Sequence, residues 1–158
     1  MDFEKPAARP GFAVSLKGRA LRYLAAREHS RAELMRKLAP HEETPGQLAQ
    51  VLDELQAKDF ISEARVVESV INRRASRLGA ARVRQELQSK GLDSARITEA
   101  VAGLQATEHE RAREVWRRRF GEQPQTLKER AKQARFLMSR GFSGSVVARL
   151  LKGGEDYE

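Results

Sequence analysis

The chain has 158 residues, the length of one domain or of two small ones. It carries 30 Lys and Arg against 22 Asp and Glu, a formal charge of +8, and only 6% of its residues are aromatic. No window approaches the roughly 18 continuous apolar residues of a membrane span, which excludes an integral membrane protein. Because there is no cysteine, a disulfide framework, thiol catalysis and a cysteine-based zinc site are also excluded.

The N-terminal sequence has early acidic residues, two prolines and no hydrophobic region of the signal-peptide type. Together with the absence of cysteine, this predicts a cytoplasmic protein.

The positive charge is concentrated in the second half of the chain. Residues 1–69 hold 11 basic and 11 acidic side chains, whereas residues 70–152 hold 19 basic and 8 acidic ones, a net charge of +11. The tail, residues 153–158, carries three acidic side chains. A basic body of this kind suits a polyanion or an acidic protein surface as partner, and the alternative is a merely solvated, arginine-rich surface.

Helix signals run along the whole chain. Capping boxes of the S/T-x-x-E/Q type are predicted at Ser30–Glu33, Thr44–Gln47, Thr107–Glu110 and Thr126–Glu129. Gly91, Gly121 and Gly141 follow apolar-periodic segments, as helix-terminating glycines do. Apolar residues recur at helical spacing, and no stretch alternates as a strand does. The sequence therefore predicts an all-α protein.

The apolar pattern repeats at intervals of 49 and 50 residues. Five positions recur 49 residues later: Leu34, Leu38, Leu48, Leu52 and Leu55 correspond to Val83, Leu87, Ile97, Val101 and Leu104. A further shift of 50 carries Leu87, Lys90, Gly91, Leu92, Ile97 and Val101 onto Leu137, Arg140, Gly141, Phe142, Val147 and Leu151. Another helical segment precedes each of these cores, at about 13–27, 62–77 and 107–120. The pattern predicts three tandem three-helix units.

Each unit has the outline of a helix-turn-helix module, with its third helix at about 45–57, 94–105 and 144–152. Units this small are expected to stack and share cores, which predicts an elongated, curved body. The predicted domains are a flexible N-terminal segment (1–12), three repeats (13–58, 59–105 and 106–152) and an acidic tail (153–158).

No constellation for catalysis is present in the sequence. His29, His41 and His109 are scattered, lack metal-ligand spacing and are expected to be exposed to solvent. There is no Walker A loop, no dinucleotide fingerprint and no nucleophile elbow. We predict a non-enzyme without a cofactor or metal. Trp116 has apolar neighbours at helical spacing and is predicted to be a core residue.

The order and spacing of several short motifs resemble the RecX family of regulatory proteins. Three stretches carry the likeness: Ala20–Leu24 followed by Ser30–Leu34 and Leu38; Phe60–Arg65 leading to Arg73–Arg74, Arg84–Leu87 and Lys90–Gly91; and Phe136–Leu137 followed by Arg140–Ser143. The resemblance covers residues 16–152.

The resemblance implies a modulator of the RecA recombinase. RecX proteins have three tandem three-helix repeats, bind in the groove of the RecA filament on single-stranded DNA, and inhibit its ATPase, strand-exchange and coprotease activities in recombination and DNA repair. We also expect the protein to be a monomer, and its charge predicts weak non-specific DNA binding as a secondary property. On charge alone, the predicted contact residues are Arg73, Arg77, Arg82, Arg84, Arg113, Arg117, Arg118 and Lys132.

Three other interpretations remain open. In a tandem helix-turn-helix DNA-binding protein acting without RecA, each third helix would enter a major groove, but these helices hold few base-reading side chains, namely Gln47, Gln50, Arg96 and Arg149. An adaptor whose charge serves solubility is the second interpretation. Binding to an anionic membrane surface is the least favoured, because no segment pairs a basic face with a strongly apolar one.

Overall fold

The computed structural model describes residues 14–152. Within this range the chain forms nine α-helices and one short 3-10 helix, with no strand. It divides into two compact units, one ending at Val66 and the other beginning at Val67. The all-α prediction is therefore confirmed, while the predicted N-terminal segment and acidic tail lie outside the described residues. None of the helices in 14–152 is long and apolar enough to cross a membrane.

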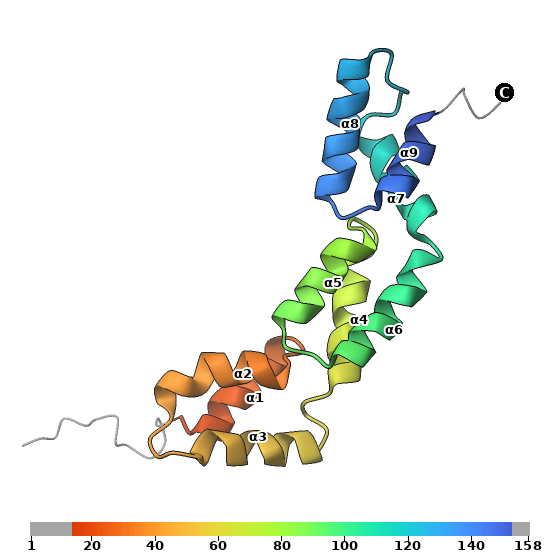
Figure 1. Cartoon of the computed structure of the whole chain (residues 1–158). Helices are drawn as coiled ribbons and strands as arrows, with labels where there is room; N and C mark the ends of the chain where they lie inside the picture. Colours follow the sequence, from red (N-terminus) through yellow and green to blue (C-terminus); the bar gives the residue numbers. More distant parts are fainter. Residues whose placement is uncertain (1–13, 153–158) are drawn as a thin grey trace, which may run out of the picture. The chain divides into compact units, whose positions relative to one another are not determined.

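Unit 1 is a three-helix bundle. It contains α1 (Leu16–Ala26), α2 (Arg31–Leu38), the 3-10 helix η2 (Ala39–His41) and α3 (Gln47–Ala57). The three α-helices contact one another pairwise (Figure 1). Their buried faces meet in a core made of Leu16, Ala20, Leu34, Leu38, Leu48, Leu52, Leu55 and Ile61. The helical spacing of these leucines explains why one face of each helix is buried.

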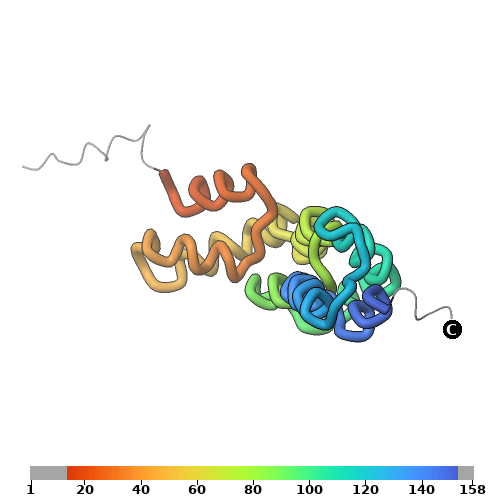
Figure 2. The backbone as a smooth tube through the Cα atoms, turned by 90° about the horizontal axis from the view of Figure 1, so that it is seen from above, coloured from red at the N-terminus to blue at the C-terminus, as the bar shows by residue number. Residues whose placement is uncertain are grey.

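Unit 2 holds the second and third repeats. Helix α4 (Glu63–Arg74) begins in unit 1 and continues into unit 2, followed by α5 (Ala80–Ser89) and α6 (Ser94–Gln105), which complete repeat 2. Repeat 3 consists of α7 (Glu108–Arg119), α8 (Leu127–Ser139) and α9 (Gly144–Lys152). Helix α5 packs on α6, and α7, α8 and α9 contact one another pairwise, as the blue end of the tube in Figure 2 shows.

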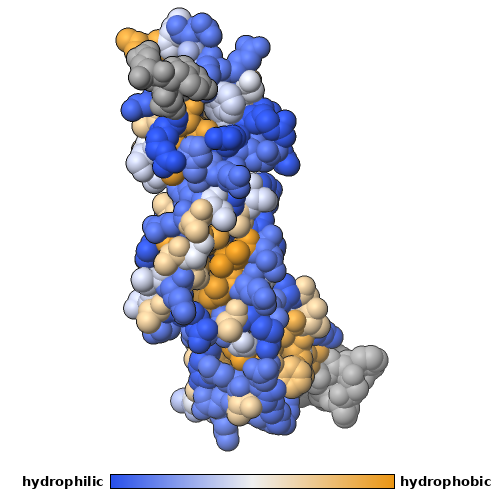
Figure 3. All heavy atoms as spheres, turned by 90° about the vertical axis from the view of Figure 1, so that its right-hand side faces the viewer, coloured by the Kyte–Doolittle hydropathy of each residue, from blue (hydrophilic) through white to orange (hydrophobic). Residues whose placement is uncertain are grey.

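The surface of unit 2 is not uniform in polarity. In the view of Figure 3, hydrophilic side chains cover most of repeat 3, whereas apolar side chains reach the surface over repeat 2. The polar surface of repeat 3 agrees with the charge counted in its sequence, where α7 alone carries five arginines.

The repeat predicted from the sequence is confirmed by burial. Every apolar position matched by the offsets of 49 and 50 residues is buried in its own repeat. Gly91, Gly121 and Gly141 all have positive φ and end their helices as predicted. Trp116 packs against the core of repeat 3 and donates its indole N–H to Gln133 Oε1 at 2.8 Å, so its predicted core role is also confirmed.

Two of the four predicted capping boxes are present, one of them in part. At Ser30–Glu33 both reciprocal hydrogen bonds form, and they fix the start of α2. At Thr126 the hydroxyl accepts from the Glu129 amide at 3.0 Å, but the Glu129 carboxylate accepts from the Gln125 amide instead of returning to Thr126.

The other two predicted boxes are wrong. Helix α3 begins only at Gln47, after Gly46 at φ 86°, so Thr44 lies in the preceding turn. Thr107 makes no side-chain cap, because its hydroxyl donates to the Leu104 carbonyl and accepts from Arg111 Nε. Arg111 also binds backbone carbonyls of repeat 2. The Thr107 hydroxyl therefore takes part in a tertiary contact instead of the helix cap that the local sequence pattern predicted.

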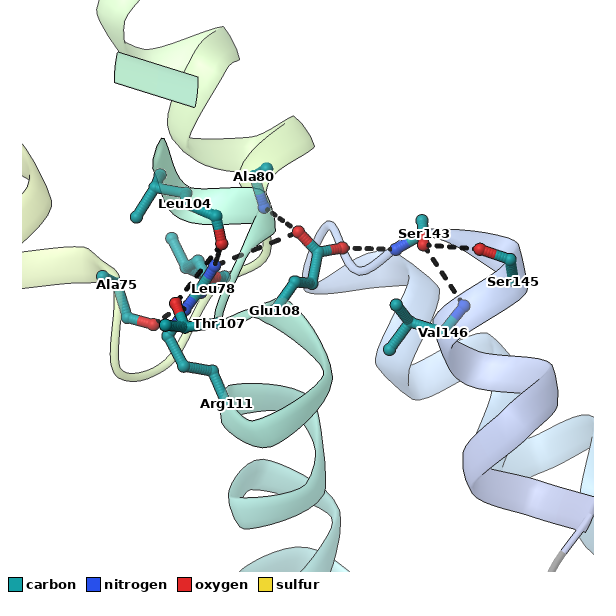
Figure 4. A network of polar contacts seen from close by, with 10 residues as sticks. All are labelled: Ala75, Leu78, Ala80, Leu104, Thr107, Glu108, Arg111, Ser143, Ser145 and Val146. Atoms are coloured by element: carbon teal, nitrogen blue, oxygen red, sulfur yellow. Dashed lines mark hydrogen bonds and ion pairs between the residues drawn. The ribbon is translucent and has the colours of Figure 1, made fainter. Parts of the chain in front are cut away.

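A buried glutamate joins the two repeats of unit 2. Glu108, at the first position of α7, is only 4% exposed. Its Oε1 accepts from the Ala80 amide at 3.1 Å and its Oε2 from the Ser143 amide at 2.8 Å. Figure 4 shows the carboxylate lying between the start of α5 and the start of α9. One side chain thus satisfies an otherwise unpaired amide at the start of two helices from different repeats.

Arg111 completes this junction from the next turn of α7. Its guanidinium donates to the carbonyls of Ala75, Leu78 and Leu104 at 2.7–2.9 Å (Figure 4). These carbonyls come from the chain that follows α4 and from the end of α6. Arg111 therefore holds the ends of two helices of repeat 2 against the first turn of repeat 3.

The backbones of the two repeats touch beside Glu108. The Gly79 amide donates to the Arg140 carbonyl at 2.8 Å. A Cβ on Gly79 would lie 2.3 Å from the Gly141 carbonyl oxygen, and one on Gly141 would lie 2.4 Å from Arg82 Cγ. Both positions therefore require glycine, and at Gly141 the φ of 94° adds a second reason.

We expect Glu108→Gln to lower the free energy of unfolding of unit 2 by about 1–3 kcal/mol, because the neutral amide can accept from only one of the two backbone N–H groups with its oxygen. Trp116 is the only tryptophan, so its fluorescence during urea unfolding reports on unit 2. The matched control is Glu99→Gln, an exposed position on α6, for which a change below about 0.5 kcal/mol is expected. Equal stability of the two variants would contradict the role given to Glu108.

His29 departs from the expectation that the histidines are exposed. It is 1% exposed, and its ring lies 5.4 Å from that of Tyr23. Its Nδ1 lies 3.1 Å from the Arg27 carbonyl and its Nε2 lies 3.1 Å from Lys37 Nζ. The first contact needs N–H at Nδ1 and the second needs a lone pair at Nε2, so the geometry fits neutral imidazole. Burial lowers the pKa of His29 below its ordinary value, with the nearby Arg27 and Lys37 charges acting in the same direction.

The stability of unit 1 is predicted to fall as the pH drops. Below the ordinary histidine pKa of about 6.5, the unfolded chain binds a proton that folded His29 resists, so acid favours unfolding. Thermal unfolding followed by circular dichroism between pH 7.5 and 5.5 measures this loss. His29→Gln is expected to reduce the pH dependence, whereas His109→Gln, in unit 2, leaves the contribution of His29 in place. An unchanged profile in His29→Gln would show that the prediction is wrong.

Candidate anion-binding site

Arginines from both repeats of unit 2 surround one hollow on its surface. The hollow has a volume of about 490 Å³. Its lining comes from the end of α4 and the turn after it, from α5, α7 and α8, and from the residue that ends α8. The lining residues are Arg74, Ser76, Arg77, Leu78, Arg82, Glu114, Val115, Arg118, Arg119, Phe136 and Arg140. We refer to it as the arginine hollow.

Three of the eight predicted contact residues meet in the arginine hollow. Arg77, Arg82 and Arg118 line it, although they are separated by up to 41 positions in the sequence. The junction at Glu108 and Gly79 explains this, because it brings the turn after α4 and the start of α5 against α7 and α8.

The other five predicted residues lie outside the arginine hollow. Arg73 is ion-paired with Glu86 at 3.7 Å, and Arg117 with Glu114. Arg84 lines a second hollow of about 460 Å³ that includes Ala80, Glu108 and Ser143. Arg113 and Lys132 are exposed on α7 and α8 and line neither hollow.

A spacing of four residues would place Arg73 and Arg77 on one face of a continuous helix, but the two side chains do not share a helix face. Helix α4 ends at Arg74, and Arg77 lies in the turn that follows. Arg111 binds the carbonyls of Ala75 and Leu78 in this turn, which therefore follows tertiary contacts rather than the helical period.

Three arginines of the hollow were missed by the sequence reasoning: Arg74, Arg119 and Arg140. The guanidiniums of Arg119 and Arg140 each lie 4.7 Å from the centroid of the half-buried Phe136 ring. The Phe120 ring meets Phe136 edge-on at a centroid distance of 5.5 Å. The sequence did contain a signal for two of them. Arg119 lies in the arginine-rich run Trp116–Phe120, and Arg140 directly precedes Gly141. The pattern around Gly141, however, indicated only the end of a helix.

Glu114 is the one acidic side chain of the arginine hollow. Its carboxylate accepts from Arg117 and from Arg118 Nε, the latter at 3.1 Å. These guanidiniums, chiefly that of Arg117, hold the pKa of Glu114 below its ordinary value. The lining contains six arginines and one carboxylate, so its net charge at neutral pH is +5.

This arrangement suits binding of an anion. The one carboxylate in the lining of the arginine hollow, Glu114, is already ion-paired with Arg117 and Arg118. Within residues 14–152, no group of three His, Cys, Asp or Glu side chains lies close enough to hold a metal ion. The hollow combines the forked donors of its arginines with three apolar side chains, Leu78, Val115 and Phe136, in the same lining.

Comparison with known proteins identifies the family. The first, second and third three-helix domains of RecX match residues 17–55, 62–101 and 106–151, respectively. A regulatory protein RecX of Leptothrix cholodnii is 62% identical over 139 residues, 88% of this chain and 88% of that protein. The chain belongs to the RecX family of regulatory proteins. A second relative with the same name, from Ralstonia nicotianae, is 51% identical and covers 94% of this chain and 93% of its own length.

Solved RecX structures have the same fold. A crystal structure of regulatory protein RecX superimposes with a TM-score of 0.72 at 23% identity, covering 95% of this chain and 79% of that one. RecX from Lactobacillus salivarius gives 0.67 at 19% identity, covering 87% and 93%. The predicted family and the predicted tandem three-helix fold are both confirmed.

We expect Glu114→Gln to strengthen anion binding by unit 2, because it removes the only carboxylate of the hollow and frees two guanidiniums. Elution from a heparin column at a higher salt concentration measures the gain. Glu99→Gln removes the same charge outside the hollow and is expected to shift elution less. Equal shifts would mean that total charge, rather than the hollow, governs binding.

Proposed function

We propose that this protein regulates the RecA recombinase by binding the RecA filament on single-stranded DNA. Binding inhibits the ATPase, strand-exchange and coprotease activities of the filament. The observation that carries the proposal is the match of all three RecX domains in order along one chain whose second unit is strongly basic. The protein acts as a cytoplasmic monomer, without a cofactor and without catalysis of its own.

The contact surface of the proposal is made of basic side chains of unit 2. Its residues are Arg73, Arg77, Arg82, Arg84, Arg113, Arg117, Arg118 and Lys132. A filament of protein and DNA is polyanionic, and a concentrated positive field both accelerates encounter and selects such a partner. The salt bridges made by Arg73 and Arg117 are exposed and therefore weak, so both guanidiniums remain available to a partner.

The rival function, sequence-specific DNA binding through helix-turn-helix units, has less support. In such a protein the third helix of each unit supplies the base contacts. The arginine hollow takes none of its lining from α3, α6 or α9. Charge on first and second helices favours contact with backbone phosphates or with a protein surface over base readout.

The test is the single-stranded-DNA-dependent ATPase of RecA, titrated with this protein in excess DNA. Inhibition well below one molecule per RecA protomer is expected, since an agent bound to a filament affects many protomers. Excess DNA separates this outcome from simple masking, because a protein that only coats DNA is diluted by it. Inhibition that disappears as DNA is added would overturn the proposal.

Charge reversal at Arg73, Arg77 and Arg117 tests the contact surface in the same assay. We expect the concentration for half-inhibition to rise at least tenfold at low salt, because attraction becomes repulsion at three positions. The matched control reverses Lys128, Arg135 and Lys152, which are exposed in the same unit and absent from the proposed surface. Unchanged filament affinity in the first variant would contradict the assignment of these residues.

A further inference from the structure

The arginine hollow is more than a basic patch, because its cations are crowded and only partly neutralised. Glu86 pairs with Arg74 at 3.0 Å and Glu114 pairs with Arg118 at 3.1 Å. Among residues 14–152, no carboxylate forms an ion pair with Arg77, Arg82, Arg119 or Arg140. Like charges gathered in one concavity repel one another, and a bound anion relieves that repulsion.

Several of these guanidiniums are already held in place. Phe136 supports Arg119 and Arg140 through ring contacts at 4.7 Å. Arg82 donates to the Ser139 carbonyl at 2.6 Å. An arginine has five N–H donors, so one such contact leaves the others free. Groups fixed before binding lose less conformational entropy when a ligand arrives.

The lining also distinguishes between kinds of anion. All its cations are arginines, whose planar forks bind phosphate oxygens in pairs, and it contains no lysine. The same lining holds the half-buried apolar side chains of Leu78 and Val115, and the Phe136 ring that Arg119 and Arg140 already contact. A ligand that combines several phosphates with a flat, weakly polar group satisfies both parts of the lining. The volume of about 490 Å³ lies in the range of pockets for small ligands, about 300–1,000 Å³.

We propose that the arginine hollow is a nucleotide-phosphate site, in which the guanidiniums bind phosphates and the apolar side chains of the lining contact a sugar or base. Nucleotide phosphates reach such a site from two sources, a single strand of DNA or a free nucleoside triphosphate. The site deepens the proposed function, since it lies on the same unit, but its ligand binds without RecA. The location at the junction of repeats 2 and 3 means that neither repeat forms the site alone.

The experiment measures fluorescence anisotropy of a fluorescein-labelled 20-nucleotide oligo(dT) titrated with the full-length protein at about 50 mM salt, without RecA. Replacing Arg77, Arg119 and Arg140 by Gln is expected to weaken binding at least tenfold. It should also lower the slope of log Kd against log salt by about one for each phosphate that the variant no longer binds. The control replaces Lys128, Arg135 and Lys152 by Gln and is expected to weaken binding less than threefold.

A charge-preserving variant separates the loss of the guanidinium forks from the loss of net charge. Replacing the same three arginines by Lys keeps every positive charge but removes the forks, and is expected to weaken binding at least threefold. Thermal unfolding verifies that the variants retain the fold. Equal weakening in the hollow and control variants, or full binding by the Lys variant, would overturn the nucleotide-phosphate site.

Competition separates the two sources of phosphate. Displacement of the labelled strand by unlabelled oligo(dT) but not by millimolar ATP assigns the site to single-stranded DNA. Displacement by ATP that is abolished in the Gln variant of the hollow assigns it to a free nucleotide. If poly-glutamate of matched charge displaces the labelled strand as effectively as oligo(dT) does, the hollow binds anions in general and the proposal is overturned. Because RecA is absent, none of these outcomes depends on RecA inhibition, and failure of the ATPase test leaves them unchanged.

Discussion

The buried carboxylate of Glu108 is the contact on which the structure of unit 2 depends. It accepts from the first amide of α5 and from the amide that precedes α9, so two helices of different repeats begin at the same side chain. An ionised carboxylate in the interior is stable only when it is hydrogen-bonded and compensated. The two amides supply the hydrogen bonds, and the Arg111 guanidinium 4.0 Å away supplies charge. This requirement fixes the register of repeat 3 against repeat 2.

The arginine hollow is a consequence of that register. With Gly79 against Gly141, the turn after α4 and the start of α5 lie beside the end of α8 and the middle of α7. Each of these segments contributes arginine, and together they carry more charge than the local carboxylates neutralise. The hydrogen bonds of Glu108 and Arg111 hold the backbone segments that carry these arginines. The free energy of folding therefore offsets the repulsion among the guanidiniums, and their N–H donors stay available to an anionic partner.

The sequence predicted the helical repeat well because its signal is periodic. Leu38, Leu87 and Leu137 occupy corresponding positions and are all fully buried. It predicted isolated polar groups less well. Thr107 carried a capping pattern that the structure does not use, and His29, expected at the surface, is buried against Tyr23 and Lys37. A hydroxyl or an imidazole makes whichever hydrogen bond the fold brings nearest, and a local pattern does not say which partner that will be.

The same distinction holds for the candidate site. Composition placed the positive charge in residues 70–152, because net charge is a simple sum over the residues of a segment. The motifs indicated the RecX family, because they recur in order along the three repeats. Sequence reasoning found Arg77, Arg82 and Arg118, but it left out Arg74, Arg119 and Arg140. Which arginines converge was decided only by the tertiary structure. Convergence depends on where α4 ends, on two glycines that let backbones touch, and on one buried carboxylate that joins two repeats.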